Sequence, residues 1–321
     1  MKAIVVHEFG PPDVMRIEDI EAPSPGPTDV LVRVRATGVN PVDTYVRAGT
    51  AARPALPYVP GMDFAGIVEA VGSQVKGLRA GARVYGSGTP MAGGACAELV
   101  VRDQAQVYPL PDGCAFAQGA ALGIPYGTAW RALFLVANAR PGDTVLVHGA
   151  SGGAGVAAVQ IARAAGLKVI GTAGTAPGLA LVTAQGAHHA LDHGAPDYLH
   201  QVMAITEGRG VNLVLEMLAN VNLDRDLDIL APAGQVVVIG NRGRVEIDPR
   251  KLMVRDASIH GLLVFNTRPE DLRVIHTGIR AGLETGALRP AVACELPLAE
   301  AAAAHARIME PGAQGKIVLV P

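Results

Sequence analysis

Residues 144–155 constrain this chain most, because an apolar run there is followed by regularly spaced glycines. The stretch is Thr-Val-Leu-Val-His-Gly-Ala-Ser-Gly-Gly-Ala-Gly, and Gly149, Gly152 and Gly155 lie three positions apart. A segment able to form a helix, residues 156–165, follows. A strand, a tight turn and a helix in this order are typical of the corner that binds a dinucleotide pyrophosphate, since glycine permits the sharp turn and the close approach of the phosphates. Free amides at the start of the helix then favour the anion.

The same residues fit a second pattern. Gly149, Ser151 and Gly153 match the G-x-S-x-G turn that presents a nucleophilic serine in α/β-hydrolases. A hydrolase would also need a later acid and histidine, for which His260 is a candidate, and an earlier glycine-rich oxyanion loop, which this sequence lacks. Dinucleotide binding is therefore favoured, and a serine hydrolase using Ser151 is a remote alternative.

Composition excludes several classes of protein. The net charge of −2 and the aromatic content of 4% argue against a nucleic-acid partner. Three widely separated cysteines show no metal-type spacing and suit a reducing cytoplasm. No signal-peptide pattern and no apolar stretch of about 18 residues is present, so we expect a cytoplasmic protein without a membrane span.

The pattern of expected secondary structure changes near residue 124. Residues 1–123 contain short expected strands separated by prolines and glycines, at 3–7, 30–36, 66–71 and 83–85. After residue 124, strands and helices alternate. The expected strands are 144–148, 168–173, 190–192, 211–216, 235–239 and 258–264, and the expected helices are 156–165, 178–185, 197–207 and 222–230. Several strands are continuous apolar runs, as a parallel sheet covered on both faces requires, so we predict a doubly wound α/β fold of the Rossmann type.

Two more predictions follow from these patterns. In the helix at 156–165, Gln160 and Arg163 form one narrow polar stripe, which predicts that both face water. Residues 265–321 resemble residues 1–123 in their pattern, and we expect helices at 269–283 and 298–309 and a strand at 316–320. We therefore expect the chain to leave one domain, build a second, and return to the first.

The end of the second strand informs the choice of coenzyme. Domains that bind NAD carry an acidic residue about 20 residues past the glycines, which holds the ribose 2′-hydroxyl. Here residues 171–175 are Gly-Thr-Ala-Gly-Thr, without a carboxylate that would repel a 2′-phosphate, so NADPH is favoured over NADH. No lysine or arginine occupies 176–178 to pair with that phosphate. His193 is a candidate partner if protonated, and a plain surface histidine otherwise.

Several motifs in series resemble one family. They are Gly-Val-Asn-Pro-Val-Asp-Thr-Tyr at 38–45, Pro-Tyr-Val-Pro-Gly-Met-Asp at 57–63, Gly-Ile-Pro-Tyr-Gly-Thr-Ala at 123–129, the 144–155 corner, and Glu-Met-Leu-Ala-Asn-Val-Asn-Leu at 216–223. In this order they resemble the zeta-crystallin-like quinone oxidoreductases of the medium-chain dehydrogenase/reductase superfamily. The resemblance implies a Rossmann domain for NADPH, residues 124–264, inserted in a GroES-like β-rich catalytic domain, residues 1–123 and 265–321.

The resemblance also assigns roles to residues. Asn40, Tyr45 and Thr128 would surround the nicotinamide and the substrate. The remaining implied coenzyme contacts are Gly149, Ser151, Gly152, Gly153, Ala154, Gly155, Gly174, His193, Asn222, Ile239, Gly240, Asn241, Arg242, Leu262, Leu263 and Val264. Simpler interpretations remain open: Asn40 as a turn residue before Pro41, Tyr45 as a structural tyrosine, and Thr128 as a helix cap. Asp43 and Asp63 are as consistent with capping or ion pairing as with catalysis.

Departures from zinc-dependent relatives predict that no metal is bound. Those relatives have a cysteine where Asn40 stands, a His-Glu pair where Met62 and Asp63 stand, and a four-cysteine lobe that this chain lacks. Converging zinc ligands are therefore missing. Without a Lewis acid, a conjugated acceptor is an easier target for hydride than an alcohol or aldehyde. Zeta-crystallin-like proteins carry a second tyrosine near Ala51, so the substrate's shape is expected to differ here.

The resulting hypothesis is an NADPH-dependent quinone reductase. The alternative is an NADPH-dependent reductase of α,β-unsaturated carbonyls or enoyl thioesters. A binding or structural role has no dedicated surface to support it. A homo-oligomer, dimer or tetramer, is expected, because the apolar strand 258–264 would lie at a sheet edge, and such edges are usually paired or covered.

Overall fold

The computed structural model describes residues 1–321 and divides into two compact units. The first unit comprises Met1–Ile124, His276–Pro311 and Gly315–Pro321, and the second comprises Pro125–Ile275 and Gly312–Gln314. The first change of unit falls one residue from the predicted boundary. The return falls later than residue 264, because the continuous helix α9 (Pro269–Glu284) begins in the second unit and ends in the first.

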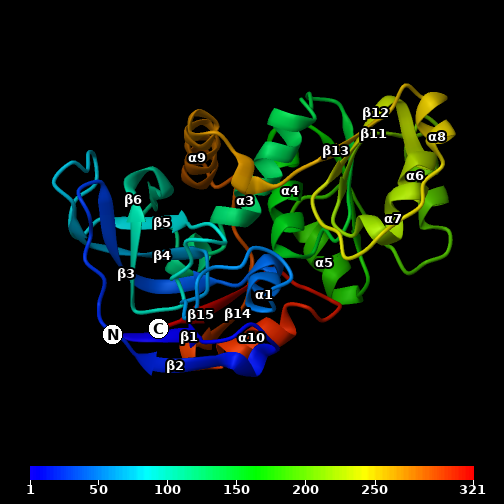
Figure 1. The fold of residues 1–321 in the computed structure, drawn as a ribbon. Coiled ribbons are helices and arrows are strands. Elements are labelled where there is room, and N and C mark those ends of the chain that lie inside the picture. Colours follow the sequence, from blue (N-terminus) through cyan, green and yellow to red (C-terminus); the bar gives the residue numbers. More distant parts are fainter. The chain divides into compact units, whose positions relative to one another are not determined.

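The first unit is rich in antiparallel strands (Figure 1). One sheet has the order β14-β15-β3-β4-β5-β7 with β6 paired to β3, and β1 pairs with β2 separately. Its strands are β1 (Lys2–Val6), β2 (Met15–Asp19), β3 (Asp29–Gly38), β4 (Asp63–Val71), β5 (Arg83–Ser87), β6 (Leu99–Asp103), β7 (Val107–Pro109), β14 (Val292–Pro297) and β15 (Lys316–Val320). Its helices are α1 (Pro41–Arg47), α2 (Phe116–Gly119) and α10 (Ala301–Arg307). Alternate residues of β3, Val30, Val32 and Val34, pack into one core with Phe64 and Val84, as a half-buried strand requires.

The second unit is built on a six-stranded, wholly parallel sheet with the order β10-β9-β8-β11-β12-β13. Its strands are β8 (Thr144–Val147), β9 (Lys168–Ala173), β10 (His189–Asp192), β11 (Val211–Glu216), β12 (Leu230–Val238) and β13 (Ser258–Gly261). Its helices are α4 (Gly153–Ala164), α5 (Ala176–Ala184), α6 (Tyr198–Ile205), α7 (Ala219–Asp226) and α8 (Pro249–Met253), and α3 (Gly123–Trp130) leads into the unit. The fold class predicted from the sequence is confirmed.

Burial of the central strand explains this architecture. Val145, Leu146 and Val147 are each 0% exposed, although neighbouring residues of a strand point to opposite faces. Both faces of β8 are therefore covered, which is the condition of a doubly wound sheet. On one face, Leu146 packs with Val214, Val236 and residues of α6 and α7.

Some local predictions were wrong. Gln160 is 5% exposed rather than facing water; its side chain accepts a hydrogen bond from the Tyr126 hydroxyl at 2.7 Å and donates to Gln185 at 2.5 Å. The predicted strand 258–264 ends at Gly261, and the chain then forms a short 3-10 turn, Val264–Asn266. The strands β2, β6, β7 and β14 and the helices α1 to α3 and α8 were not predicted, because each is short and lacks a clear hydrophobic period.

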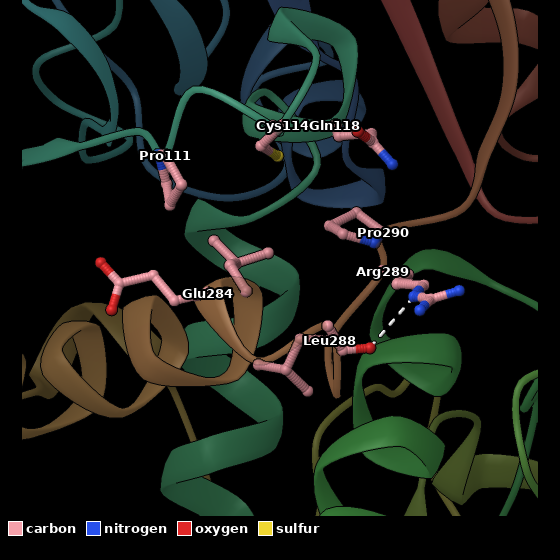
Figure 2. Close-up of a pocket in the computed structure, with 10 residues that line it drawn as sticks. Pro111, Cys114, Gln118, Glu284, Leu288, Arg289 and Pro290 are labelled. Atoms are coloured by element: carbon pink, nitrogen blue, oxygen red, sulfur yellow. Dashed lines mark hydrogen bonds between the residues drawn. The ribbon is translucent and has the colours of Figure 1, made fainter.

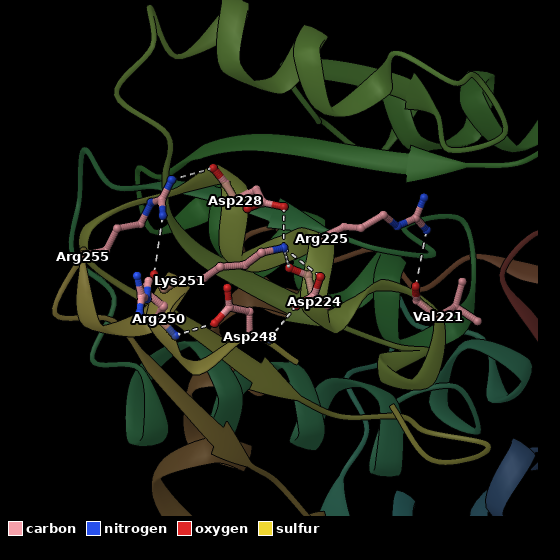
Figure 3. Close-up of polar contacts among 8 residues, drawn as sticks. All are labelled: Val221, Asp224, Arg225, Asp228, Asp248, Arg250, Lys251 and Arg255. Atoms are coloured by element: carbon pink, nitrogen blue, oxygen red, sulfur yellow. Dashed lines mark hydrogen bonds and ion pairs between the residues drawn. The ribbon is translucent and has the colours of Figure 1, made fainter. Parts of the chain in front are cut away.

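The strand β13 lies at the edge of the sheet, as the sequence predicts. Before it in the chain, Lys251 of α8 pairs with Asp224 of α7 and with Asp228 in the turn after α7: its Nζ lies 2.7 Å from Asp224 Oδ2 and 2.8 Å from Asp228 Oδ2 (Figure 3). These ion pairs hold α8, which lies between β12 and β13 in the chain, against α7 and the turn after it. None of the helices combines the length and the apolar character needed to cross a membrane.

Candidate functional site

The glycine turn after β8 has the geometry of a phosphate-binding corner. Gly149 has a φ of +55°, in the region that glycine adopts most readily. A Cβ at position 155 would lie 2.2 Å from the Gly149 carbonyl oxygen, so only glycine lets α4 pack against the turn. At Gly152, by contrast, the nearest atom would be 3.5 Å from a Cβ, an ordinary contact. Packing within the protein therefore requires Gly155 but not Gly152.

The start of α4 is available to an anion. Gly152 is its N-cap residue, with φ −78° and ψ 173°, and no side chain caps the helix. The amides of Gly153, Ala154 and Gly155 have no partner within the helix, as at every helix start. Such a terminus offers several N–H donors and the positive end of a dipole to a phosphate.

Ser151 has no catalytic partner. It is 6% exposed and its hydroxyl forms no hydrogen bond with a histidine. His260, the base proposed for a hydrolase, bonds instead to Ser258 Oγ at 3.0 Å. The arrangement therefore lacks the nucleophile–base contact that a serine hydrolase needs, and the hydrolase alternative has no geometric support.

The end of β9 brings Gly174 and His193 together. A Cβ at position 174 would lie 2.7 Å from His193 Nε2, so the imidazole rests against the glycine backbone. Thr175 caps α5 by accepting a hydrogen bond from the Gly178 amide at 3.2 Å. Partial burial, together with repulsion from His148, lowers the pKa of His193 below 6.5. The imidazole is thus neutral near pH 7 and presents an N–H rather than a full positive charge.

Asn222 and the segment 239–242 lie beyond the carboxyl ends of β11 and β12. The Asn222 amide donates to Glu216 Oε1 at 3.3 Å and accepts from Arg225 at 3.1 Å. Gly240 is required because a Cβ there would lie 2.2 Å from the Met217 carbonyl oxygen. Its neighbours Ile239, Asn241 and Arg242 are held by backbone or side-chain hydrogen bonds; the Arg242 amide, for example, donates to Asn220 Oδ1 at 2.8 Å. The Arg242 side chain is exposed.

Thr128 and the segment 262–264 are close in the second unit. Gly127 faces Val264, since a Cβ at position 127 would lie 3.6 Å from Val264 Cγ2. The guanidinium of Arg131 donates to the Leu263 carbonyl, and the Leu262 amide donates to Val238 at 3.0 Å. Thr128 is buried inside α3 rather than at its start, so the helix-cap interpretation of this residue is wrong.

In the first unit, Asn40 belongs to a buried cluster with a lysine. Its Nδ2 donates to Asp63 Oδ2 at 2.9 Å, and the Lys316 ammonium donates to Asn40 Oδ1 and to Asp63 Oδ2, the latter at 3.0 Å. The other oxygen of Asp63 accepts from the Ile124 amide at 2.9 Å. Lys316 and Asp63 are 2% and 0% exposed. The cluster therefore links β15, β4 and the starts of α1 and α3.

Asp43 and Tyr45 share helix α1 with different roles. Asp43 closes a capping box with Asn40, accepting from the Asn40 amide at 2.8 Å. Burial raises the pKa of Asp43 to about 7. Asp43 and Asp63 therefore act in capping and ion pairing, one of the two interpretations left open by the sequence. Tyr45 is half-buried, and its hydroxyl has no hydrogen-bond partner within the chain, which leaves it available to a ligand.

Sequence reasoning missed two groups of polar residues. Lys316 begins an apolar strand and gave no sign that it would be buried. His148, Glu216 and Asp226 converge in the second unit and are residue types that bind metals. The only available signal was Glu216, a carboxylate at the end of a continuous apolar strand. The expected absence of a metal stays a prediction.

A separate hollow lies in the first unit (Figure 2). Its volume is about 460 Å³, and it is lined by residues including Cys114, Gln118, Glu284 and Arg289. None of the residues that the sequence assigned to coenzyme or substrate lines it. It is therefore not the candidate site.

Comparison with known proteins places these features in context. Residues 26–112 match the family model described as alcohol dehydrogenase GroES-like domain, and residues 153–277 match that described as zinc-binding dehydrogenase. The quinone oxidoreductase of Homo sapiens is 45% identical over 323 residues, covering 100% of this chain and 98% of the relative. The Escherichia coli quinone oxidoreductase complexed with NADPH has a TM-score of 0.89 at 29% identity, with all of both chains covered. A structure described as an NAD-dependent alcohol dehydrogenase has a TM-score of 0.92 at 30% identity, again with full coverage of both chains.

Replacing Lys316 tests whether the buried cluster holds the first unit together. Lys316→Met leaves the Asp63 carboxylate buried without its cation, so we expect a loss of about 3–5 kcal/mol in the free energy of unfolding. Lys2→Met is the matched control, because Lys2 and Asp19 form an exposed pair at 3.3 Å and such pairs contribute about 1 kcal/mol or less. Urea unfolding measures both; equal, small losses would contradict a structural role for Lys316.

Proposed function

Because this chain belongs to the quinone oxidoreductases of the medium-chain dehydrogenase/reductase superfamily, we propose that it reduces a quinone with NADPH and without a metal. The observation that carries the proposal is the turn at Gly149–Gly155. Its uncapped helix start and the glycine at position 152, which packing does not demand, together suit a pyrophosphate.

The residues around the adenosine end favour NADPH. No carboxylate follows β9 to repel a 2′-phosphate, and His193 rests on Gly174 where that phosphate would bind. The His193 N–H donates to the phosphate, and a bound dianion raises the imidazole pKa, so that the ring becomes positively charged on binding. The relative from Escherichia coli, described as complexed with NADPH, agrees with this assignment.

The proposed chemistry assigns simple tasks to the residues near the nicotinamide. Bound NADPH supplies the hydride, which is the chemistry of the coenzyme itself. The Tyr45 hydroxyl donates a hydrogen bond to a quinone oxygen or to the nicotinamide amide. Thr128 and the backbone of 262–264 hold the nicotinamide in position. Positioning of the two reactants then supplies most of the rate.

Lys316 supports the metal-free part of the proposal. Its ammonium contacts Asn40 and Asp63, two of the positions at which zinc-dependent relatives carry other residue types. The Lys316 side chain therefore supplies the positive charge of this cluster. A second proton of the Asn40 amide remains to orient a substrate or a water, while the first is bonded to Asp63.

The activity itself is the direct test. Oxidation of NADPH followed at its absorbance band should be rapid with 1,2-naphthoquinone and slower by at least about tenfold in kcat/KM with an enone or an enoyl thioester. The reverse order would establish the alternative, a reductase of activated alkenes. The alternative is retained because Ala51 stands where zeta-crystallin-like proteins have a second tyrosine, so that the substrate's shape is expected to differ.

Two variants separate recognition of the pyrophosphate from recognition of the 2′-phosphate, and each serves as the control for the other. Gly152→Ala should keep the melting temperature, yet weaken NADPH and NADH alike by about tenfold, because the methyl group occupies the pyrophosphate surface. His193→Ala should weaken NADPH by about tenfold and leave NADH unchanged, because only NADPH has the 2′-phosphate.

Titration of coenzyme fluorescence measures both affinities in each protein. Unchanged binding by Gly152→Ala would place the coenzyme elsewhere. Equal losses for the two coenzymes in His193→Ala would remove the argument for NADPH.

We also propose that the protein is a homo-oligomer, a dimer or a tetramer, formed through β13. This strand is an unpaired edge of the sheet, and exposed apolar residues lie close to it along the chain, among them Leu263 at 53% and Val254 at 69%. Light scattering should give a mass of two or four chains, and Leu263→Glu should lower it. A monomeric mass at micromolar concentration would contradict this assembly.

A further inference from the structure

Three buried polar side chains meet at the carboxyl ends of the two central strands of the second unit. His148 follows β8, Glu216 ends β11, and Asp226 ends α7. Their side chains are 3%, 0% and 0% exposed, and His148 Nε2 lies 2.8 Å from Asp226 Oδ1 and 3.5 Å from Glu216 Oε2. One oxygen of each carboxyl group and one nitrogen of the imidazole all lie within 4.8 Å of one another.

Two carboxyl oxygens of this cluster have no hydrogen-bond donor. They are Glu216 Oε2 and Asp226 Oδ2. Burial raises the pKa of Asp226 to about 7. Burial and the neighbouring Asp226 raise the pKa of Glu216 to about 7, against an opposing effect of His148. Burial lowers the pKa of His148, so the imidazole does not supply a full positive charge. Two adjacent carboxyl groups in such a site cannot both ionise cheaply, and a proton on one of them removes their repulsion and supplies a hydrogen-bond donor.

Glu216 connects this cluster to a residue assigned to the coenzyme. Its Oε1 accepts hydrogen bonds from the Leu218 amide and from Asn222 Nδ2, the latter at 3.3 Å. Arg225 holds the opposite end of the Asn222 amide at 3.1 Å. The orientation of Asn222 therefore depends on where Glu216 lies, and Glu216 lies beside Asp226 in the cluster.

The surroundings contain no other group that neutralises the two acids. Thr172 Oγ1 lies 3.4 Å from His148 Nδ1, and the Tyr198 ring meets the imidazole edge-on at 6.3 Å between centroids. Arg225, on α7, is exposed and acts on Asp226 only through its charge. His148 lowers the pKa of His193.

We propose that Glu216 and Asp226 share one proton, and that Glu216 is thereby a positioning residue that holds Asn222 for the dinucleotide. This inference rests on the proposed binding of NADPH. When the proton is lost, the two carboxylates repel each other, Glu216 shifts, and Asn222 loses its partner. The negative phosphates of the coenzyme oppose this ionisation. The coenzyme therefore binds the protonated pair more tightly, takes up part of a proton on binding, and loses affinity as pH rises through neutrality.

The test compares wild-type protein with E216Q between about pH 7 and pH 9. In the wild type, the Kd for NADPH should rise about fivefold to tenfold over this range. In E216Q the rise should be smaller than in the wild type by at least about threefold, because an amide keeps a neutral donor beside Asp226 at every pH and only the titration of His193 remains. The KM for NADPH should follow the Kd, while kcat changes little. Titration calorimetry in two buffers of different ionisation enthalpy should detect more proton uptake in the wild type than in E216Q, where only His193 takes up a proton.

The control is D228N. Asp228 is 53% exposed, follows α7, and pairs with Lys251, which keeps Asp224 as a second partner (Figure 3). This variant removes one carboxylate close in the chain to Asp226 and should keep the wild-type pH profile. The range lies above the second phosphate pKa of about 6, and the difference between proteins cancels the titration of the coenzyme and of His193. D226N should flatten the profile as E216Q does, which keeps the test valid if E216Q folds poorly.

Three results would overturn the inference. Equal pH dependence in wild type, E216Q and D226N would show that the pair carries no shared proton. A stoichiometric divalent metal in the wild type, absent from E216Q, would show that a cation rather than a proton joins the two carboxylates. Absence of NADPH binding by the wild type at every pH would overturn the proposed function as well, which distinguishes that failure from the other two.

Discussion

Complete burial of the central strands is the constraint on which the second unit depends. Val145, Leu146 and Val147 exclude water from both faces of β8, so polar groups can approach it only at the strand ends. The glycine turn, Glu216 and the segment 239–242 all follow from this, because each lies at or just beyond the carboxyl end of a strand. Chemistry in a doubly wound sheet gathers at that edge for the same physical reason.

Both units bury charged groups, and they do so by different means. In the first unit, the Lys316 ammonium meets Asp63 and Asn40, so that a positive charge is neutralised where it is buried. In the second, no lysine or arginine side chain forms an ion pair with Glu216 or Asp226, and the neighbouring imidazole is itself hard to ionise. A shared proton then replaces the missing cation. A buried ion pair resists pH change near neutrality, whereas a proton-sharing pair responds to it.

The sequence predicted the strands 168–173, 211–216 and 316–320 at their observed bounds, because each is rich in apolar residues and begins one or two residues after a glycine. The sheet order placed the strand beginning at Ser258 at the edge, as predicted. Gln160 was predicted to face water from its place in a helical stripe. It is buried because Tyr126 and Gln185, from other elements, satisfy its amide. A helical pattern depends only on residues of the same helix, so it cannot predict hydrogen-bond partners that come from other elements.

By itself, the sequence determined the glycine turn, the alternation of strands and helices, and the lack of an acidic residue after the second strand. These features depend on residues a few positions apart, whose backbone preferences act locally. Only the tertiary structure decided which polar side chains share a buried site. Asn40 and Lys316 are 276 positions apart, and His148 and Asp226 are 78 apart. Contacts of that span are set by how sheets and helices pack, because a side chain meets its distant partner only after the core has formed.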